Sequence, residues 1–192
     1  VLASVIGGIT VTGLNPDSQQ GDKVILDILK RCGGKFKPVE GGLHFDRSLL
    51  KATEIDLADC PDLGPILFTL GCFCSGETVI RNAGRLRLKE SDRIEAMQTE
   101  LRKMGARIEV DGDTVHIQGV ALHAPNAPLS GHNDHRIVMA LAVAAIASGL
   151  PALLCGAEAV DKSWPAFWSV LRGLGAKVEL NTDKQEEFDI KA

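Results

Sequence analysis

The sequence predicts an α/β domain built from three copies of one supersecondary unit, with helices buried in its middle. The first observation is a repeat: a glycine opens a short, apolar, strand-like run at Gly8, Gly76 and Gly149, and an amphipathic helix follows each run. These helices end alike, in L-K-R-C-G-G-K, L-R-K-M-G-A-R and L-R-G-L-G-A-K. A period of roughly 70 residues indicates a whole unit used again, not a solenoid of small turns.

Two further observations define the unit. Ahead of the second and third glycines lie P-D-L-G-P-I-L-F-T-L-G-C-F-C-S and N-D-H-R-I-V-M-A-L-A-V-A-A-I-A-S, and a helix that is apolar on every face belongs in a core. In the second copy, A-R-I-E-V and T-V-H-I-Q alternate with period two around an Asp-Gly turn, which predicts a hairpin. Each unit is therefore a buried helix, a strand, an amphipathic helix and a hairpin.

The individual elements follow this pattern along the chain. Helical spacing puts two sets of apolar residues on single helix faces: Ile94, Met97, Leu101 and Met104, and Trp164, Phe167, Trp168, Leu171 and Leu174. We therefore expect the two tryptophans to belong to the core. Gly105 and Gly175 suit the position just after a helix end.

We place the domain at 1–180, with repeats at about 1–50, 51–120 and 121–180, and a polar, frayed tail at 181–192. The first repeat is truncated, because V-L-A-S-V-I has the pattern of the last turns of a buried helix. We infer that the chain is part of something larger, cut near a domain boundary.

Composition narrows the functional classes. With 192 residues, 45% of them hydrophobic and 24% charged, the chain is typical of a globular protein with a real core. The formal net charge of -4 argues against nucleic-acid binding. Five scattered cysteines form neither a disulfide framework nor a zinc motif, which favours a reducing, cytoplasmic setting. The longest apolar stretch, 137–147, is too short for a bilayer, so we expect no membrane partner.

Charged residues at the helix starts indicate the chemistry. Arg93, Arg136 and Lys162 lie at or just before three predicted helix N-termini, where a cation opposes the helix dipole. Free N–H groups at a helix start already bind anions, and arginine adds a bidentate fork. Because related turns of a repeat tend to share a face, these cations could converge on one anionic ligand. The nearby acids Asp62 and Glu90 could then transfer protons.

Structural interpretations compete at each turn. Lys89 and Arg93 are four residues apart and could form only a solvated face with weak ion pairs. For Asp62 alone, a helix N-cap and a catalytic group are equally acceptable. Residues that could cap the other helices are Ser91 or Asp92, Asn133 or Asp134, and Ser163.

The pair His132 and His135 forms H-x-x-H, a spacing that invites a metal site. No third ligand stands at a suitable spacing, so we expect no metal. We instead expect His135 to pack against, or hydrogen-bond to, the start of its own helix.

Taken together, these segments resemble the carboxyl-terminal domain of the 5-enolpyruvylshikimate-3-phosphate synthase family over essentially the whole chain. The motifs that carry the resemblance are P-D at 61–62, R-L-K-E-S-D-R at 87–93, L-R-K-M-G-A at 101–106, N-D-H-R at 133–136 and D-K-S-W-P at 161–165. The resemblance implies the enolpyruvyl transferase fold, in which each of two hinged domains has three βαβαββ units with buried helices, an inside-out α/β barrel.

The resemblance also implies a reaction. The family transfers the enolpyruvyl group of phosphoenolpyruvate to the 5-hydroxyl of shikimate 3-phosphate, releasing phosphate, without a metal or organic cofactor. The route is addition to a tetrahedral intermediate and then elimination, a step in chorismate and aromatic amino acid synthesis. The implied partners are these two substrates and an amino-terminal domain of the same enzyme.

By position, the resemblance implies roles for seven residues. Asp62 matches the general base at the shikimate 5-hydroxyl, and Glu90 the acid near the enolpyruvyl methylene. Lys89 matches a contact to shikimate 3-phosphate. Arg85 stands where some members carry an asparagine with the same contact. The cations that hold phosphoenolpyruvate match Arg93, Arg136 and Lys162.

Two other functions are weighed against this one. The enolpyruvyl transferase that acts on a UDP-sugar shares fold and reaction but lacks the K-E-S-D-R and N-D-H-R pair in this form. A non-catalytic anion-binding module of the same fold predicts that Asp62 and Glu90 are dispensable. Because the family's other domain supplies further anion contacts, we expect this chain to fold without turning over by itself.

Overall fold

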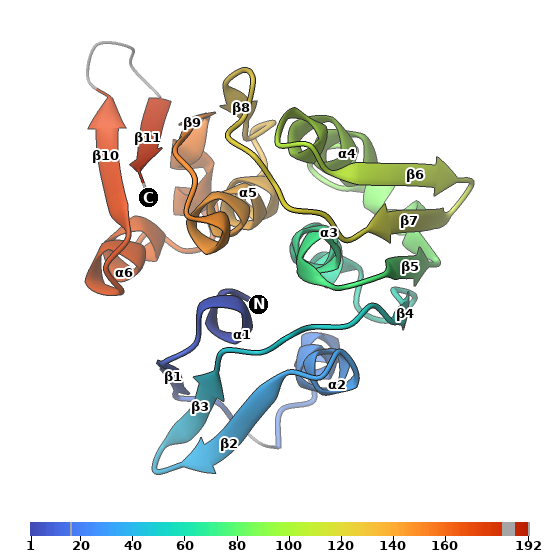
Figure 1. Ribbon diagram of the computed structural model, residues 1–192, viewed down its shortest axis with the longest axis vertical. Helices are drawn as coiled ribbons and strands as arrows, with labels where there is room; N and C mark the ends of the chain where they lie inside the picture. The colour runs from blue at the N-terminus through green and yellow to red at the C-terminus, as the bar shows by residue number, and fades with distance from the viewer. Residues whose placement is uncertain (16, 182–186, 192) are drawn as a thin grey trace.

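The structure is a computed structural model that describes residues 1–15, 17–181 and 187–191. Figure 1 shows three helices, α1 (Leu2–Ile6), α3 (Gly64–Phe73) and α5 (His135–Ser148), end-on near the centre, with a β-sheet beyond each of them. This confirms the predicted architecture, in which helices occupy the inside and sheets the outside. The helices lie inside because their sequences present apolar side chains in every direction.

The second repeat shows the complete unit. In chain order its elements are β4 (Glu54–Asp56), η2 (Pro61–Leu63), α3, β5 (Glu77–Arg81), η3 (Ala83–Leu88), α4 (Arg93–Lys103), β6 (Arg107–Asp111) and β7 (Thr114–Gln118). The strands are ordered β4-β5-β7-β6; the first pair is parallel and the others are antiparallel. The hairpin predicted around the Asp-Gly turn is β6–β7. The unit is thus βαβαββ.

The third repeat has the same order, β10-β11-β9-β8 when listed from its other edge. Its elements are β8 (Leu129–Ser130), α5, β9 (Ala152–Cys155), η4 (Ala157–Lys162), α6 (Phe167–Gly173), β10 (Lys177–Asn181) and β11 (Glu187–Lys191). The frayed tail predicted at 181–192 is therefore wrong for residues 187–191, which form β11 and pair antiparallel with both β10 and β9. Residues 182–186 and 192 of that prediction lie outside the described residues. The sequence E-F-D-I-K alternates with period two, a strand signal that the surrounding charges obscured.

The first repeat has fewer elements. It contains α1, β1 (Ile9–Thr12), η1 (Gly21–Val24), α2 (Ile25–Arg31), β2 (Lys35–Val39) and β3 (Gly42–Asp46), with strand order β1-β3-β2. Among the described residues, no strand corresponds to β4 or β8, as predicted for a truncated repeat. A mostly apolar cavity of about 640 Å³ lies between the start of α1, β1, α5 and α6.

Helices α3 and α5 form the centre of the core. Their packing is apolar except for Thr69, whose hydroxyl donates to the carbonyl of Ala140 at 3.0 Å. This bond satisfies a fully buried hydroxyl and joins the two helices across repeats. The apolar face predicted for α4 is confirmed, because Ile94, Met97, Leu101 and Met104 are all buried. Gly105 and Gly175 follow their helices with φ of 86° and 94°, as expected after a helix end.

The third amphipathic helix starts later than predicted. Helix α6 begins at Phe167 with Ala166 at its N-cap and no side-chain cap bond, so Ser163 is not its cap. The apolar face of this helix is correspondingly shorter. Phe167, Trp168 and Leu171 are buried, whereas Trp164 is 44% exposed and Leu174 is 47% exposed. The prediction that Trp164 belongs to the core was wrong, because it precedes the helix; its ring instead packs edge-on against Phe167.

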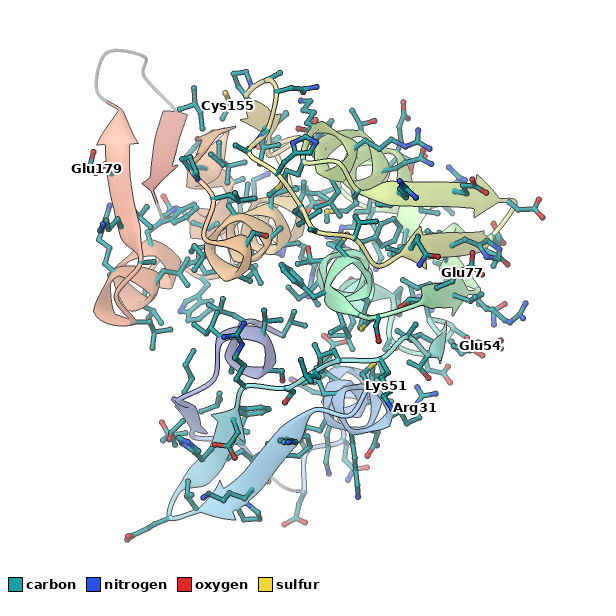
Figure 2. All side chains as sticks on the ribbon, in the orientation of Figure 1. Arg31, Lys51, Glu54, Glu77, Cys155 and Glu179 are labelled. Atoms are coloured by element: carbon teal, nitrogen blue, oxygen red, sulfur yellow. The ribbon has the colours of Figure 1, made fainter. Side chains whose placement is uncertain are left out.

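Polar contacts tie the first repeat to the second. Figure 2 shows Arg31, Lys51 and Glu54 on neighbouring elements. Arg31 of α2 donates to the main-chain carbonyl of Glu54 at 2.9 Å, and the Lys51 N–H donates to the carbonyl of Cys32 at 2.8 Å. Hydrogen bonds therefore join the first repeat to the second.

Cys32, Cys60, Cys72 and Cys74 are buried free thiols, and burial raises the pKa of Cys72 to about 12. Burial also raises the pKa of Cys60, which makes these two thiols poor nucleophiles. Within the described part of the chain, no helix combines the length and apolar character that crossing a bilayer requires.

Candidate functional site

Asp62 lies at the centre of a cluster of cations. Its Oδ1 is 3.1 Å from both Lys89 Nζ and Arg93 Nη1, and its Oδ2 accepts from Arg136 Nη2 at 3.1 Å. Arg136 also donates to the Asp62 carbonyl at 3.1 Å. The predicted cations of the second and third repeats thus meet at one carboxylate.

The local fold explains this placement. Asp62 is the second residue of η2, a single turn that leads directly into α3 and packs against η3. The close approach requires Gly64, because a Cβ there would lie 2.6 Å from the Leu86 side chain. Lys89 follows η3, so this contact brings it within reach of Asp62. The N-cap interpretation of Asp62 is wrong: Cys60 holds the cap position, and no side chain caps the turn.

A buried ion pair with Asp134 holds Arg93 in this cluster. Arg93 donates from Nε to Asp134 Oδ2 at 2.8 Å and from Nη2 to Oδ1 at 3.3 Å. The side chain of Arg93 is 3% exposed and that of Asp134 is 0% exposed. Asp134 is also the N-cap of α5, and Asp92 is the N-cap of α4. In each case one of the two predicted capping residues is confirmed.

The cations govern the charge state of both carboxyl groups. Partial burial by itself would raise the pKa of Asp62, but the Lys89 hydrogen bond and the charges of Arg136 and Lys89 outweigh it and lower that pKa. At Asp134, burial is likewise outweighed, chiefly by the Arg93 hydrogen bond, and the pKa is lowered. Both groups are therefore carboxylates at neutral pH, and Asp62 is a weak base while the cations hold it.

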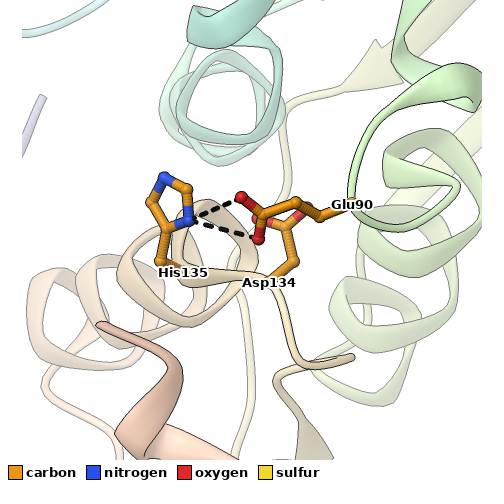
Figure 3. Close-up of side chains that lie close together, drawn as sticks. All are labelled: Glu90, Asp134 and His135. Carbon is orange, nitrogen blue, oxygen red and sulfur yellow. Dashed lines mark hydrogen bonds and ion pairs between the residues drawn. The ribbon is translucent and has the colours of Figure 1, made fainter. Parts of the chain in front are cut away.

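The second candidate acid, Glu90, lies beside this cluster. Figure 3 shows the His135 ring directed at the Glu90 carboxylate, and His135 Nδ1 is 3.2 Å from Glu90 Oε1. His135 therefore contacts the second repeat, while its ring nitrogen also lies within 4.8 Å of the Asp134 carboxylate at the start of its own helix. Lys162 Nζ lies 3.9 Å from Glu90 Oε2 and donates to the side-chain oxygen of Asn133 at 2.9 Å. All three repeat-related cations thus border the two acids.

The sequence reasoning missed two residues of the site. Asp134 was predicted only as a cap, and His135 only as part of its own helix. The two lie next to each other in N-D-H-R, beside the predicted cation Arg136. That adjacency was the available signal, but the residues they contact come from another repeat.

Glu90, Asp134 and His135 could also be considered as metal ligands, because one potential ligand atom from each lies within 4.8 Å of the others. The surroundings oppose a cation there. Both Asp134 oxygens accept from Arg93, and Oδ2 also accepts from Ser91. The nearby ammonium of Lys162 would repel a divalent ion. The cations around these carboxylates therefore disfavour a divalent metal ion.

Arg85 is placed apart from this cluster. Its guanidinium donates to the carbonyl of Ala58 at 3.2 Å, and its side chain is exposed. Among the described residues, no ion pair joins Arg85 to Asp62 or Glu90.

Comparison with known proteins agrees with the fold. The family model for EPSP synthase (3-phosphoshikimate 1-carboxyvinyltransferase) matches residues 1–171. The chain is 44% identical over 172 residues to the 3-phosphoshikimate 1-carboxyvinyltransferase of Clostridium acetobutylicum, covering 90% of this chain and 40% of that protein. It is 44% identical over 181 residues to the protein of the same name from Methanocella arvoryzae, covering 93% and 42%.

Solved structures show the same architecture. The chain superposes on EPSP synthase from Acinetobacter baumannii with a TM-score of 0.75 and 26% identity, over 90% of this chain and 43% of that one. The enolpyruvyl transferase NikO from Streptomyces tendae shares the fold, with a TM-score of 0.69 and 22% identity, over 89% and 37%.

Fold and comparisons together place the chain among domains of the enolpyruvyl transferase fold. More narrowly, the chain belongs to the EPSP synthase (3-phosphoshikimate 1-carboxyvinyltransferase) family. It spans about 40% of the length of the curated relatives that it matches.

Proposed function

We propose that the protein containing this chain transfers the enolpyruvyl group of phosphoenolpyruvate to the 5-hydroxyl of shikimate 3-phosphate. The observation that carries the proposal is the meeting of Lys89, Arg93 and Arg136 at Asp62. Two substrates that bring phosphates and carboxylates need several fixed cations within one site. Membership of the family supports the identity of those substrates.

The cations divide between the two substrates in this proposal. Arg93, Arg136 and Lys162 hold phosphoenolpyruvate, and Lys89 contacts the phosphate of shikimate 3-phosphate. Arg136 and Lys89 are 31% and 27% exposed, so an incoming anion can reach them. Arg93 is buried on Asp134 and contributes mainly its charge and the position of Asp62. Arg85 remains a candidate contact at the edge of the site.

Asp62 and Glu90 perform the proton transfers. The 5-hydroxyl oxygen bonds to C2 of phosphoenolpyruvate and passes its proton to Asp62, while Glu90 gives a proton to the methylene carbon. In the second step a methyl proton returns to Glu90, the bond from C2 to the phosphate oxygen breaks, and the departing phosphate takes up the proton held by Asp62. His135, 3.2 Å from Glu90, holds this carboxyl in place.

Substrate anions also activate the base in this scheme. Lys89 and Arg136 lower the pKa of Asp62 in the structure. When substrate phosphate and carboxylate groups draw these cations away, the pKa of Asp62 rises toward its ordinary value and the carboxylate becomes a stronger base. Binding and proton transfer are thereby coupled.

The remaining components of the site come from elsewhere in the protein. We propose that an amino-terminal domain closes over this chain and supplies further anion contacts, so that 1–192 binds anions without turnover. The setting is cytoplasmic, consistent with the reduced, buried thiols.

The test supplies the amino-terminal domain of a curated relative in trans and measures phosphate release. Asp62→Ala and Glu90→Ala are each expected to lower kcat by about 10²- to 10⁴-fold, while substrate affinity is largely kept. Glu95→Ala, which removes an exposed carboxylate from the first turn of α4, is the matched control and should leave kcat unchanged.

Two outcomes would favour the alternatives. Turnover with a UDP-sugar but not with shikimate 3-phosphate would identify the enolpyruvyl transferase that acts on a UDP-sugar. Binding of anions without any turnover in the reassembled protein would identify a non-catalytic module and overturn the proposal.

A further inference from the structure

Glu100 of α4 is a buried carboxylate outside the cluster around Asp62. Its side chain is 2% exposed, and three donors satisfy it. Lys103 Nζ donates at 2.7 Å, the main-chain N–H of Ser130 at 2.8 Å, and His132 Nε2 lies 3.1 Å away. Because a carboxylate only accepts hydrogen bonds, the contacting nitrogen of His132 carries the hydrogen. Glu100 therefore ties the second repeat to the segment that enters α5.

That segment is a turn in an uncommon conformation. His132 and Asn133 have φ of 49° and 53°, and two successive non-glycine residues in the left-handed region need support from their surroundings. Gly131 before them is tightly enclosed, since a Cβ there would lie 2.4 Å from the Val138 side chain. Two side chains hold His132 in this turn: Glu100 accepts from its ring, and the Ser130 hydroxyl accepts from its main-chain N–H at 3.2 Å.

The two residues that follow His132 in this turn contact two cations of the site. Asn133 accepts from Lys162, and Asp134 accepts from Arg93. Both contacts depend on where the backbone leaves His132. A turn that relaxed toward ordinary dihedral angles would move these two anchors and the cations that they hold.

We propose that Glu100 and His132 are positioning residues of the anion site. They act through the turn at 131–134 and set the places of Lys162 and Arg93 without contacting substrate. The inference rests on the proposed function only in taking those cations as substrate contacts. It assigns a purpose to a buried carboxylate that the family resemblance and the repeat pattern leave unexplained.

The experiment measures two properties of the chain: its affinity for inorganic phosphate by calorimetry, and the hydrogen exchange of the Gly131 and Asp134 amides. Both amides are hydrogen-bonded, to the carbonyls of Cys155 and Gly131 at 2.8 and 2.9 Å. His132→Leu is expected to weaken phosphate binding by about tenfold and to accelerate both amides, because it removes a hydrogen bond to a charged group.

Three variants distinguish positioning from general stability. His132→Gln keeps a donor at the place of Nε2 and should restore phosphate affinity to within about twofold of the unmodified chain. His132→Gly relieves the left-handed strain but lacks the donor, so it should bind as weakly as His132→Leu. His116→Ala removes a comparable exposed contact, to Glu77 at 3.5 Å on the outer sheet (Figure 2), and should change neither property.

The outcomes separate this inference from the proposed function. If His132→Leu binds phosphate like the unmodified chain while Lys162→Ala loses affinity, the anion site stands and the positioning role is overturned. If the unmodified chain does not bind phosphate, the proposed anion site fails. Hydrogen exchange then still tests whether His132 positions the turn. Faster exchange of Asp134 in His132→Leu, reversed in His132→Gln, supports the positioning role, and unchanged exchange refutes it.

Discussion

Replacing Asp62 by asparagine tests whether this carboxylate occupies the place of a ligand anion. The substitution removes the negative charge that Lys89, Arg93 and Arg136 share, while a carboxamide oxygen can still accept one of their hydrogen bonds. If Asp62 competes with incoming anions, Asp62→Asn should bind inorganic phosphate more tightly than the unmodified chain.

The magnitude follows from the geometry. The three cations lie 3.1 Å from Asp62, so an anion that shares them lies about 6 Å from the carboxylate. Two unit charges about 6 Å apart repel by about 0.7 kcal/mol in bulk water and by about 2.8 kcal/mol at an effective dielectric constant of about 20. Because the Asp62 side chain is 38% exposed, solvent screening favours the lower part of this range. We expect about 1 kcal/mol, or roughly fivefold tighter binding.

Calorimetric titration with phosphate at pH 7 and low salt measures the effect. Glu54→Gln is the matched control: it removes one negative charge from an exposed pair with Arg81, at 2.6 Å, on a different part of the domain. It should leave the phosphate affinity unchanged. Equal or weaker binding by Asp62→Asn, with the fold intact by circular dichroism, would show that Asp62 organises the cations and does not compete for them.

Three further predictions concern stability. Asp134→Ala leaves the Arg93 guanidinium buried without its partner, so urea denaturation should show a loss of about 3–5 kcal/mol. The pKa values of Asp62 and Asp134 in the folded state are lowered from 3.8. The stabilisation from these two carboxylates is therefore complete well above 3.8 and is lost as the pH falls through their folded pKa values. The urea midpoint should drop between about pH 5 and pH 2, and the drop should be less steep in Asp134→Ala. Gly131→Ala would place a Cβ 2.4 Å from Val138, and thermal unfolding should show a cost of about 1–3 kcal/mol.

The sequence predicted the repeated fold well because each element has a local signal. The buried helices are apolar in every direction, and the β6–β7 hairpin alternates around its turn. The prediction for the third amphipathic helix failed at its start. Ser163 and Pro165 resemble a helix start, but α6 begins only at Phe167, which leaves Trp164 outside the core.

The site was predictable in its residue types but not in its pairings. Repeat-related cations indicated an anion site, and the structure brings Arg93 and Arg136 together at Asp62. Some pairings join residues from different repeats, such as Arg93 with Asp134, and others, such as Arg93 with Asp62, lie within the second repeat. Their separations along the chain match no helix or strand period. Only the packing of α3, α4 and α5 determines which of these charges meet.

The salt bridge between Arg93 and Asp134 affects how the domain unfolds. Local melting of either repeat would strand one of these two groups, at 3% and 0% exposure, as a lone charge in an apolar interior. Partial denaturation that releases one repeat and spares its neighbour is therefore disfavoured, and the two should lose structure in a single cooperative transition. The same ion pair that orders the cation cluster around Asp62 thus makes the second and third repeats behave as one folding unit.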